Sequence, residues 1–291
     1  MLERCVLLLA LWLCGGQALA AITVFDDQQR AVHLNAPPTR VISLLPSLTE
    51  TVCALEQCHR LVGLDRYSNW PERIRSLPRM GGGLDPDIES IVAQRPDLVL
   101  LAGSTRGVER LQSLGITVLR LEPRTHADVQ RVLRTVALAL GLQPAQGDRV
   151  WAGIEAGLLS AARSLAPSVH GVRVYVEVGP APFGASEASF IGETLRRLGA
   201  GNILPASMGP FPQINPEFVV RAQPDVIMAG ESSRTVLLQR PGWPQLRAVR
   251  EQRVCLFPPE QADILVRAGP RMDEAARLMA QCLAGKTGVR P

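Results

Sequence analysis

The sequence predicts an α/β protein made of two Rossmann-like lobes joined by a long connecting helix. First, one pattern of helix and strand residues occurs twice, at 87–103 and at 215–230. Second, amphipathic helical segments alternate with short apolar runs bounded by Gly or Pro, which is typical of parallel α/β sheets. Third, an alanine- and leucine-rich helical segment from 144 to about 166 lies between the copies. At ~1.5 Å per residue, such a helix is long enough to connect two lobes.

The two copies share the same features in the same order. Each begins with a helix-capping side chain, Asp87 or Asn215, followed two residues later by Glu89 or Glu217. A capping oxygen accepts from the free N–H groups of the first helical turn, and the positive end of the helix dipole favours the glutamate. A short helix, a Pro-Asp pair and an apolar strand follow. Chance recurrence of a common α/β pattern is the alternative, but it accounts least well for the matched glutamates. Two similar lobes imply a cleft between them, where ligands usually bind.

Length and pattern divide the chain into four segments. We expect a signal peptide at 1–20, an N-terminal α/β lobe at 21–143, the connecting helix at 144–168 and a C-terminal α/β lobe at 169–291. The 291 residues suit one or two domains, and 46% apolar with 20% charged residues is an ordinary globular composition. A net charge of +4 with scattered basic residues disfavours a nucleic-acid-binding function.

The first twenty residues have the pattern of an export signal. A charged start precedes an apolar run from Cys5 to Cys14 and a small-residue site that ends at Ala20. The run is shorter than the roughly 20 residues that span a bilayer. Cys14 follows leucine instead of a small residue, so lipidation is not expected. We therefore predict an exported soluble protein that is cleaved near Ala20.

Four cysteines remain in the mature chain: Cys53, Cys58, Cys255 and Cys282. Export to an oxidising compartment favours two disulfides, for which three pairings are possible. We favour Cys53–Cys58 and Cys255–Cys282, because each pair would then stay within one lobe. A metal site is the rival interpretation. Since there is no Cys-x-x-Cys and no second histidine near His59, we expect no metal.

The N-terminal lobe begins with two elements of strand type. Residues 22–34 predict a β-hairpin that turns near 26–29, with His33 on its outer face, and residues 40–45 predict a buried strand. We expect Ser47 to cap the next helix and Glu50, three residues later, to complete a capping box.

The next strand, at 61–65, leads into a polar loop that carries Tyr67 and Trp70. Loops that follow parallel strands form the binding edge of an α/β sheet, so we predict that both aromatic side chains line the ligand site. Packing of Trp70 beneath its own loop is the alternative. A glycine triplet ending at Gly83 follows. It lacks the lysine of a phosphate-binding loop and suits close approach of two backbone segments.

The remaining elements continue the alternation. Helices are expected at 108–114, 126–142, 190–198 and 272–283, and strands at 116–121, 173–178 and 254–257. Two Pro/Gly-rich loops of the C-terminal lobe carry Phe183 and Phe211, which would face Tyr67 and Trp70 across the cleft. Aromatic side chains offer large apolar surfaces with little conformational entropy to lose.

Binding is therefore better supported than catalysis. The sequence has no Gly-x-Ser-x-Gly elbow and no His-Glu-x-x-His motif, so no catalytic residues are predicted. An exported α/β enzyme with an unrecognised acid–base pair is the alternative of another class. Asp263, Arg267 and Arg271 would give the ligand oriented polar contacts, unless they form only a surface ion pair and helix-end charges.

The matched glutamates suggest a protein partner. If the lobes are related by a pseudo-twofold axis, Glu89 and Glu217 stand at equivalent points. Such a pair suits a two-fold symmetric partner that presents the same basic patch twice. The alternative is that each glutamate only complements its helix dipole, worth roughly 0.3–1 kcal/mol.

Five motifs carry a resemblance to a known family. They are Arg40-Val-Ile-Ser-Leu-Leu-Pro-Ser-Leu-Thr-Glu50, Leu61-Val-Gly63, Pro96-Asp97-Leu-Val99, Pro241-Gly-Trp243 and Arg267-Ala-Gly-Pro-Arg271. In order and spacing they resemble the periplasmic binding proteins of ABC importers for iron-siderophores, haem and cobalamin, over nearly all of the mature chain. The resemblance implies a helical-backbone binding protein that closes little on its ligand. It also implies a periplasmic monomer whose Glu89 and Glu217 dock onto arginines of a permease dimer, which works with an ATPase.

Within this family the chain is most similar to the cobalamin-binding branch. The resemblance implies that Tyr67, Phe183 and Phe211 lie against the corrin, and that Asp263 and Arg267 supply polar contacts. Gly83 stands near a position where that branch can carry an aromatic residue, and Phe211 where a tryptophan can occur. Cobalamin or a related corrinoid is thus the expected ligand, and a ferric siderophore or haem is the alternative. No cofactor is expected, and the histidine cluster of bare-metal binders is missing from the sequence.

Overall fold

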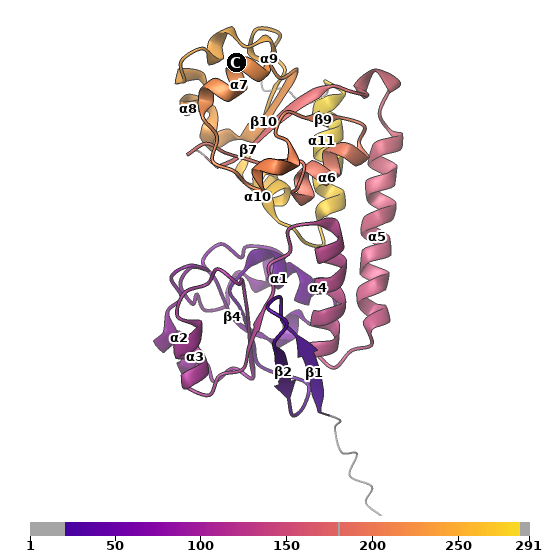
Figure 1. Ribbon diagram of the computed structural model, residues 1–291. Coiled ribbons are helices and arrows are strands. Elements are labelled where there is room, and N and C mark those ends of the chain that lie inside the picture. The colour runs from indigo at the N-terminus through magenta and orange to yellow at the C-terminus, as the bar shows by residue number, and fades with distance from the viewer. Residues whose placement is uncertain (1–20, 180, 286–291) are drawn as a thin grey trace, which may run out of the picture.

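Figure 1 shows two lobes stacked one above the other, with the helix α5 running along the side of both. This computed structural model describes residues 21–179 and 181–285. The predicted signal peptide, 1–20, lies outside the described residues. Among those residues, no helix is both long enough and apolar enough to cross a membrane.

The N-terminal lobe is built on a parallel sheet with the strand order β4-β3-β5-β6. Its strands are β3 (Val41–Ser43), β4 (Leu61–Leu64), β5 (Leu98–Leu101) and β6 (Val118–Arg120), and its helices are α1 (Pro46–Ala54), α2 (Ile88–Ala93), α3 (Val108–Ser113) and α4 (His126–Ala139). The predicted hairpin is confirmed as β1 (Ile22–Phe25) and β2 (Ala31–Leu34), with His33 exposed. It packs against α4.

The C-terminal lobe repeats this arrangement. Its strands are β7 (Arg173–Gly179), β8 (Phe183–Gly184), β9 (Gly201–Asn202), β10 (Val226–Gly230) and β11 (Val254–Phe257), and its helices are α6 (Phe190–Arg197), α7 (Pro216–Ala222), α8 (Arg234–Gln239), α9 (Arg247–Arg250), α10 (Pro259–Val266) and α11 (Met272–Leu283). The parallel strands have the order β9-β7-β10-β11, and β8 pairs antiparallel with the end of β7.

The two sheets therefore have the same topology. Numbered within each lobe, both parallel sheets have the order second, first, third, fourth strand. The repeated sequence occupies the same place in each lobe: α2 leads into β5, the third strand of one lobe, and α7 leads into β10, the third parallel strand of the other. The prediction of two similar α/β lobes is confirmed.

The connecting helix α5 (Pro144–Arg163) packs between helices of both lobes. Two glycines allow close packing at these contacts. A Cβ at Gly147 would meet the backbone of Leu133 in α4, and one at Gly157 would meet Asp273 in α11. The sequence predicts that this helix continues to about 166, but it ends at Arg163 because Pro167 disfavours helical geometry in the residue before it and begins a separate 3-10 turn.

Apolar packing continues across the junction of the lobes. The main core of the C-terminal lobe extends through Trp151 of α5 to Val129 and Leu133 of α4. The N-terminal lobe has its own core clusters, one on each side of its sheet. The two lobes thus share continuous apolar packing along α4 and α5, and this packing limits how far they can separate.

Both favoured disulfides are present, each within one lobe. Cys53–Cys58 joins the end of α1 to the turn before β4, with a Cα–Cα distance of 4.4 Å. Cys255–Cys282 joins β11 to α11, at 6.0 Å.

The predicted capping box of α1 is wrong. The helix begins at Pro46 after Leu45, without a side-chain cap, and Ser47 lies inside it. Glu50 points away from the helix terminus and is buried in ion pairs with the other lobe. The repeated caps are correct: Asp87 accepts from the N–H of Ser90, and Asn215 from that of Glu217.

Candidate functional site

A hollow of about 220 Å³ lies at the carboxyl ends of β3, β4 and β5. It is lined by Leu44, Leu45, Pro46, Asp65, Tyr67, Gly83, Leu84, Asp85, Ala102 and Ser104. The side chains of Tyr67 and Leu84 are each 61% exposed, which is unusual for large apolar groups. The hollow faces the other lobe, because the backbone of Tyr67 bonds to Arg267 and Ser47, next to the lining residue Pro46, contacts Gly269.

The loop that carries Tyr67 is fixed from below by buried polar groups. Asp65 Oδ1 accepts from the N–H of Ser68 at 2.8 Å, and the Ser68 hydroxyl lies 2.9 Å from that of Thr49 in α1. Arg79 donates to the carbonyls of Asp65 and Ser68 at 3.1 and 2.6 Å. Burial raises the pKa of Asp65. This support leaves the ring of Tyr67 outside, over the hollow.

The glycine triplet allows close backbone approach, as predicted. A Cβ on Gly83 would lie 2.9 Å from the carbonyl oxygen of Leu44, and Gly81 has φ +81°. Next to the triplet, Arg66 and Asp85 form an exposed ion pair at 2.6 Å. Gly83 can therefore contact a ligand only through its backbone, and the neighbouring Leu84 supplies the apolar surface.

The two phenylalanines predicted for the site lie on the C-terminal lobe. Phe183 is in β8, beside the end of β7, and is 39% exposed. Phe211 is half-buried, with its ring 6.0 Å from that of Phe190 in the core. Phe183 thus presents the larger free surface, whereas Phe211 has a packing role as well.

Arg267 and Arg271 are paired across the lobes instead of lining an open cavity, and each is only 8% exposed. Arg267 Nη1 donates to Glu50 Oε1 at 2.8 Å and Arg271 Nη2 to the same oxygen at 2.7 Å. Asp263 accepts from Arg267 and from Asn69, at 2.9 and 2.8 Å. The predicted polar residues are therefore brought together, but they hold the lobes to each other.

Trp70 packs against a residue of the other lobe. Its ring stacks on the guanidinium of Arg271, 4.7 Å from ring centroid to Cζ, and yet it is 38% exposed. Glu50 was missed as a site residue, because its capping-box spacing gave a local explanation. The only sequence signal was the pair of arginines four residues apart, Arg267 and Arg271, and their acidic neighbours Asp263, Asp273 and Glu274 offered a local explanation for both charges.

The matched glutamates Glu89 and Glu217 are both exposed, and each is the second residue of its helix, α2 or α7. No ion pair within 4.0 Å involves either of them among the described residues. The buried Trp243 supports α7, since its indole N–H donates to the carbonyl of Pro216 at 3.2 Å. Two unpaired carboxylates thus occupy equivalent positions on the two lobes.

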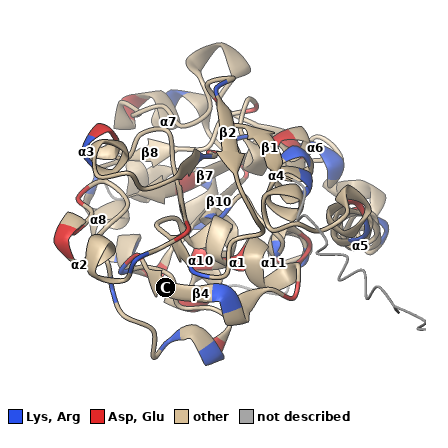
Figure 2. Ribbon diagram, turned by 90° about the horizontal axis from the view of Figure 1, so that it is seen from below, with Lys and Arg blue, Asp and Glu red and all other residues tan. Residues whose placement is uncertain are grey.

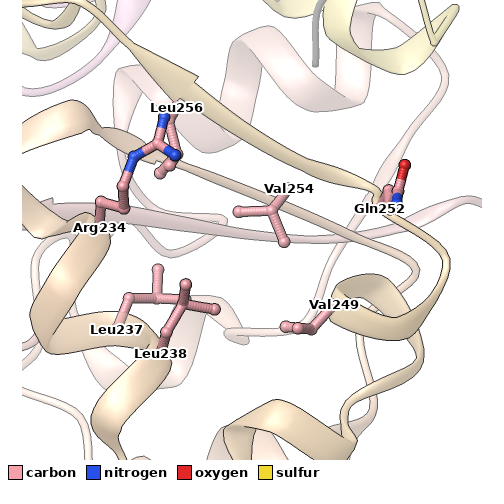
Figure 3. A pocket seen from close by; sticks show the side chains of 7 residues that line it. All are labelled: Arg234, Leu237, Leu238, Val249, Gln252, Val254 and Leu256. Carbon is pink, nitrogen blue, oxygen red and sulfur yellow. The ribbon is translucent and has the colours of Figure 1, made fainter. Parts of the chain in front are cut away.

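A second, mainly apolar hollow of about 30 Å³ lies between α8, α9 and β11 (Figure 3). None of the predicted site residues line it. In Figure 2, acidic and basic residues are interspersed over the face of the molecule that is shown. In the described part of the chain, no cluster of three or more His, Cys, Asp or Glu is arranged to hold a metal ion.

The chain has two α/β lobes on one connecting helix, and a partly aromatic hollow faces their junction. These features define a ligand-binding protein of the two-lobed class. The family model of periplasmic binding proteins matches residues 41–261. The chain belongs to this family, whose members are transport proteins and not an enzyme class.

Individual proteins agree with this assignment. The chain is 24% identical over 274 residues to the uncharacterized ABC transporter substrate-binding lipoprotein YvrC of Bacillus subtilis, covering 90% of this chain and 85% of that one. It is 29% identical over 257 residues to the vitamin B12-binding protein of Pectobacterium atrosepticum, covering 86% and 90%. Among solved structures, the periplasmic haem-binding protein RhuT of Roseiflexus is similar, with a TM-score of 0.72, 25% identity and coverage of 85% and 98%.

Proposed function

We propose that this protein binds cobalamin or a related corrinoid in the periplasm and delivers it to an ABC importer. The observation that carries the proposal is the character of the hollow. Its exposed side chains are mainly uncharged, with the aromatic Tyr67 and the apolar Leu84 among them. On the other lobe, Phe183 is a further exposed aromatic side chain. A corrin ring offers a broad surface for such groups and carries neutral amide arms.

The pairing of the arginines supports a neutral ligand. Haem carries two propionates and many ferric siderophores are anionic, so their binding favours free cationic side chains. Arg267 and Arg271 are occupied by Glu50, and Arg66 is paired with Asp85. The similarity to the vitamin B12-binding protein of Pectobacterium atrosepticum favours the same ligand class.

Haem is the second candidate, favoured by the structural similarity to RhuT. The exposed phenol of Tyr67 offers an oxygen ligand that a ferric iron accepts. The two candidates differ in a measurable way, because a Tyr67→Phe substitution keeps an aromatic surface for a corrinoid but removes the iron-ligating oxygen.

The delivery step uses the matched glutamates. We propose that Glu89 and Glu217 dock onto basic residues of a permease dimer that works with its ATPase, with the binding protein acting as a monomer. Their exposure, their equivalent helix positions and their lack of ion pairs in the described part of the chain support this role.

Aromatic contacts with the ligand are tested by truncation. Tyr67→Ala and Phe183→Ala should each weaken cyanocobalamin binding by about tenfold or more, because buried aromatic groups carry large shares of binding energy. Leu159→Ala, which removes an exposed apolar side chain from α5, is the control and should bind normally. Unchanged affinity in both aromatic variants would place the ligand elsewhere.

A further inference from the structure

One carboxylate in the N-terminal lobe holds two cations of the C-terminal lobe. Glu50, on α1, is 1% exposed. Its Oε1 accepts from Arg267 at 2.8 Å and from Arg271 at 2.7 Å, and its Oε2 accepts from Arg271 Nε at 3.1 Å. Both carboxylate oxygens are therefore used by groups that are more than 200 residues away in sequence and belong to the other lobe.

The charges of this cluster balance only when the lobes are together. Arg267 and Arg271 carry two positive charges, and Glu50 supplies one negative charge. The second comes from Asp263, which accepts from Arg267 Nη2 at 2.9 Å. Separating the lobes would leave a buried carboxylate on one side and an excess of positive charge on the other, which is unfavourable unless water enters.

The same arginine also holds the Tyr67 loop. Arg267 Nη2 donates to the carbonyl of Tyr67 at 3.0 Å, and its Nη1 donates to Asn69 Oδ1 at 2.9 Å. Asn69 in turn donates to Asp263 at 2.8 Å. Because Glu50 fixes the guanidinium of Arg267, it also fixes the loop that places Tyr67 over the hollow.

A second contact between the lobes lies beside the connecting helix. The N–H of His126 in α4 donates to Glu193 in α6 at 2.6 Å, and the N–H of Phe190 donates to the carbonyl of Arg124 at 2.7 Å. The imidazole of His126 packs edge-on against Trp151 of α5. This contact and α5 join the lobes at one place, and the cluster around Glu50 joins them at another.

We propose that Glu50 is a positioning residue that sets the separation of the two lobes and the place of the Tyr67 loop, without touching the ligand. In this arrangement the main role of Arg267 is to bond the two lobes to each other, and contact with the ligand is secondary. The consequence for ligand affinity rests on the proposed function, whereas the consequence for lobe separation in the ligand-free protein does not.

Lobe separation is measured by electron–electron double resonance between spin labels at Leu114→Cys and Val236→Cys. These two exposed positions lie on opposite lobes, and all four cysteines of the described chain are in disulfides. Glu50→Gln keeps the shape of the side chain and removes its charge. We expect a longer mean distance and a wider distribution in the ligand-free Glu50→Gln protein, at a temperature where it is fully folded.

The matched control is Asp273→Asn, which makes the same change of charge and breaks the Arg277–Asp273 ion pair within α11. This control should keep the wild-type distance, because its ion pair does not cross between the lobes. A Glu50→Gln distribution identical to that of wild type would overturn the proposal.

Asn69→Ala covers the case in which Glu50→Gln does not fold. It removes the side-chain links of the Tyr67 loop to Arg267 and Asp263 but leaves Glu50 paired. A smaller shift in the same direction is therefore expected, and no shift would contradict the proposal. In a parallel titration, cyanocobalamin should bind Glu50→Gln about tenfold more weakly than Asp273→Asn, because preorganisation is lost. If wild type binds no cobalamin, the proposed function fails while the distance measurement still decides the role of Glu50.

Discussion

A Cβ atom on Gly147 would stand 2.7 Å from the backbone carbonyl of Leu133, so α5 and α4 pack backbone against backbone at this point. Gly157 makes the corresponding close contact with α11, where a Cβ would stand 2.5 Å from that of Asp273. The connecting helix thus meets each lobe at a glycine. The cost of glycine in a helix, about 1 kcal/mol relative to alanine, is offset by the packing that it permits.

Alanine substitutions separate these two effects. We expect Gly147→Ala to lower the free energy of unfolding by about 1–3 kcal/mol, because the added methyl group meets backbone atoms that cannot rotate away. Gly153→Ala, on the exposed side of the same helix, should raise it by about 0.5–1 kcal/mol, because no atom lies within 4 Å of its Cβ position. Urea denaturation of the two variants measures both. Equal changes would show that close packing of α5 does not require glycine.

Acid should weaken the contact between α4 and α6. Burial holds the pKa of His126 below its usual 6.5; Glu193 raises it, and Arg197 and Arg196 lower it. Protonation would place a proton on Nδ1, which is buried and has no hydrogen-bond partner among the described residues. Since the unfolded chain binds a proton near pH 6.5 and the folded chain only at lower pH, stability contributed by neutral His126 falls as the pH drops below about 6.5.

The pH effect is measured by comparing the unfolding free energy of wild type and His126→Gln between pH 8 and pH 5. Wild type should lose stability from this histidine as the pH falls below about 6.5, with a slope of at most about 1.4 kcal/mol for each pH unit. His126→Gln should lack that part of the slope. Parallel curves for the two proteins would assign the acid sensitivity to other groups.

Charge reversal tests the docking surface. Glu89→Lys together with Glu217→Lys should abolish cobalamin uptake in cells that depend on this protein, because both contacts with a basic permease become repulsive. Ligand affinity of the purified variant should be unchanged. The control is Glu72→Lys with Glu251→Lys, which changes the net charge equally at exposed glutamates of the two lobes. Normal uptake by the first variant would remove these glutamates from docking.

Local patterns allowed most of the architecture to be predicted. The repeated caps of α2 and α7, the apolar strands that follow them, and the helix that begins at Pro144 depend on neighbouring residues, and the structure has all of them. The disulfide pairing followed from keeping each pair within one lobe. Such features are determined within one turn, one helix or one lobe, so a single sequence contains the information.

The polar part of the site was harder to predict, for a physical reason. Ser47 and Glu50 have the spacing of a capping box, but a cap on α1 would leave Arg267 and Arg271 without a buried anion. Glu50 pairs with these arginines, more than 200 residues away, instead of capping α1. Burying a charge without a partner costs more free energy than losing a helix cap. No local pattern reports such a contact, and the same contact explains why Trp70 lies on Arg271.

Binding of a neutral corrinoid at the hollow that faces the junction of the lobes is the main prediction. It is tested most directly by calorimetric titration of the purified protein, residues 21–291, with cyanocobalamin, haem and a ferric siderophore in parallel. We expect one-to-one binding of cyanocobalamin with a Kd of about 1 µM or lower, near −8 kcal/mol, and much weaker binding of the two iron chelates. Tight binding of haem or the siderophore by folded protein that does not bind cyanocobalamin would contradict it.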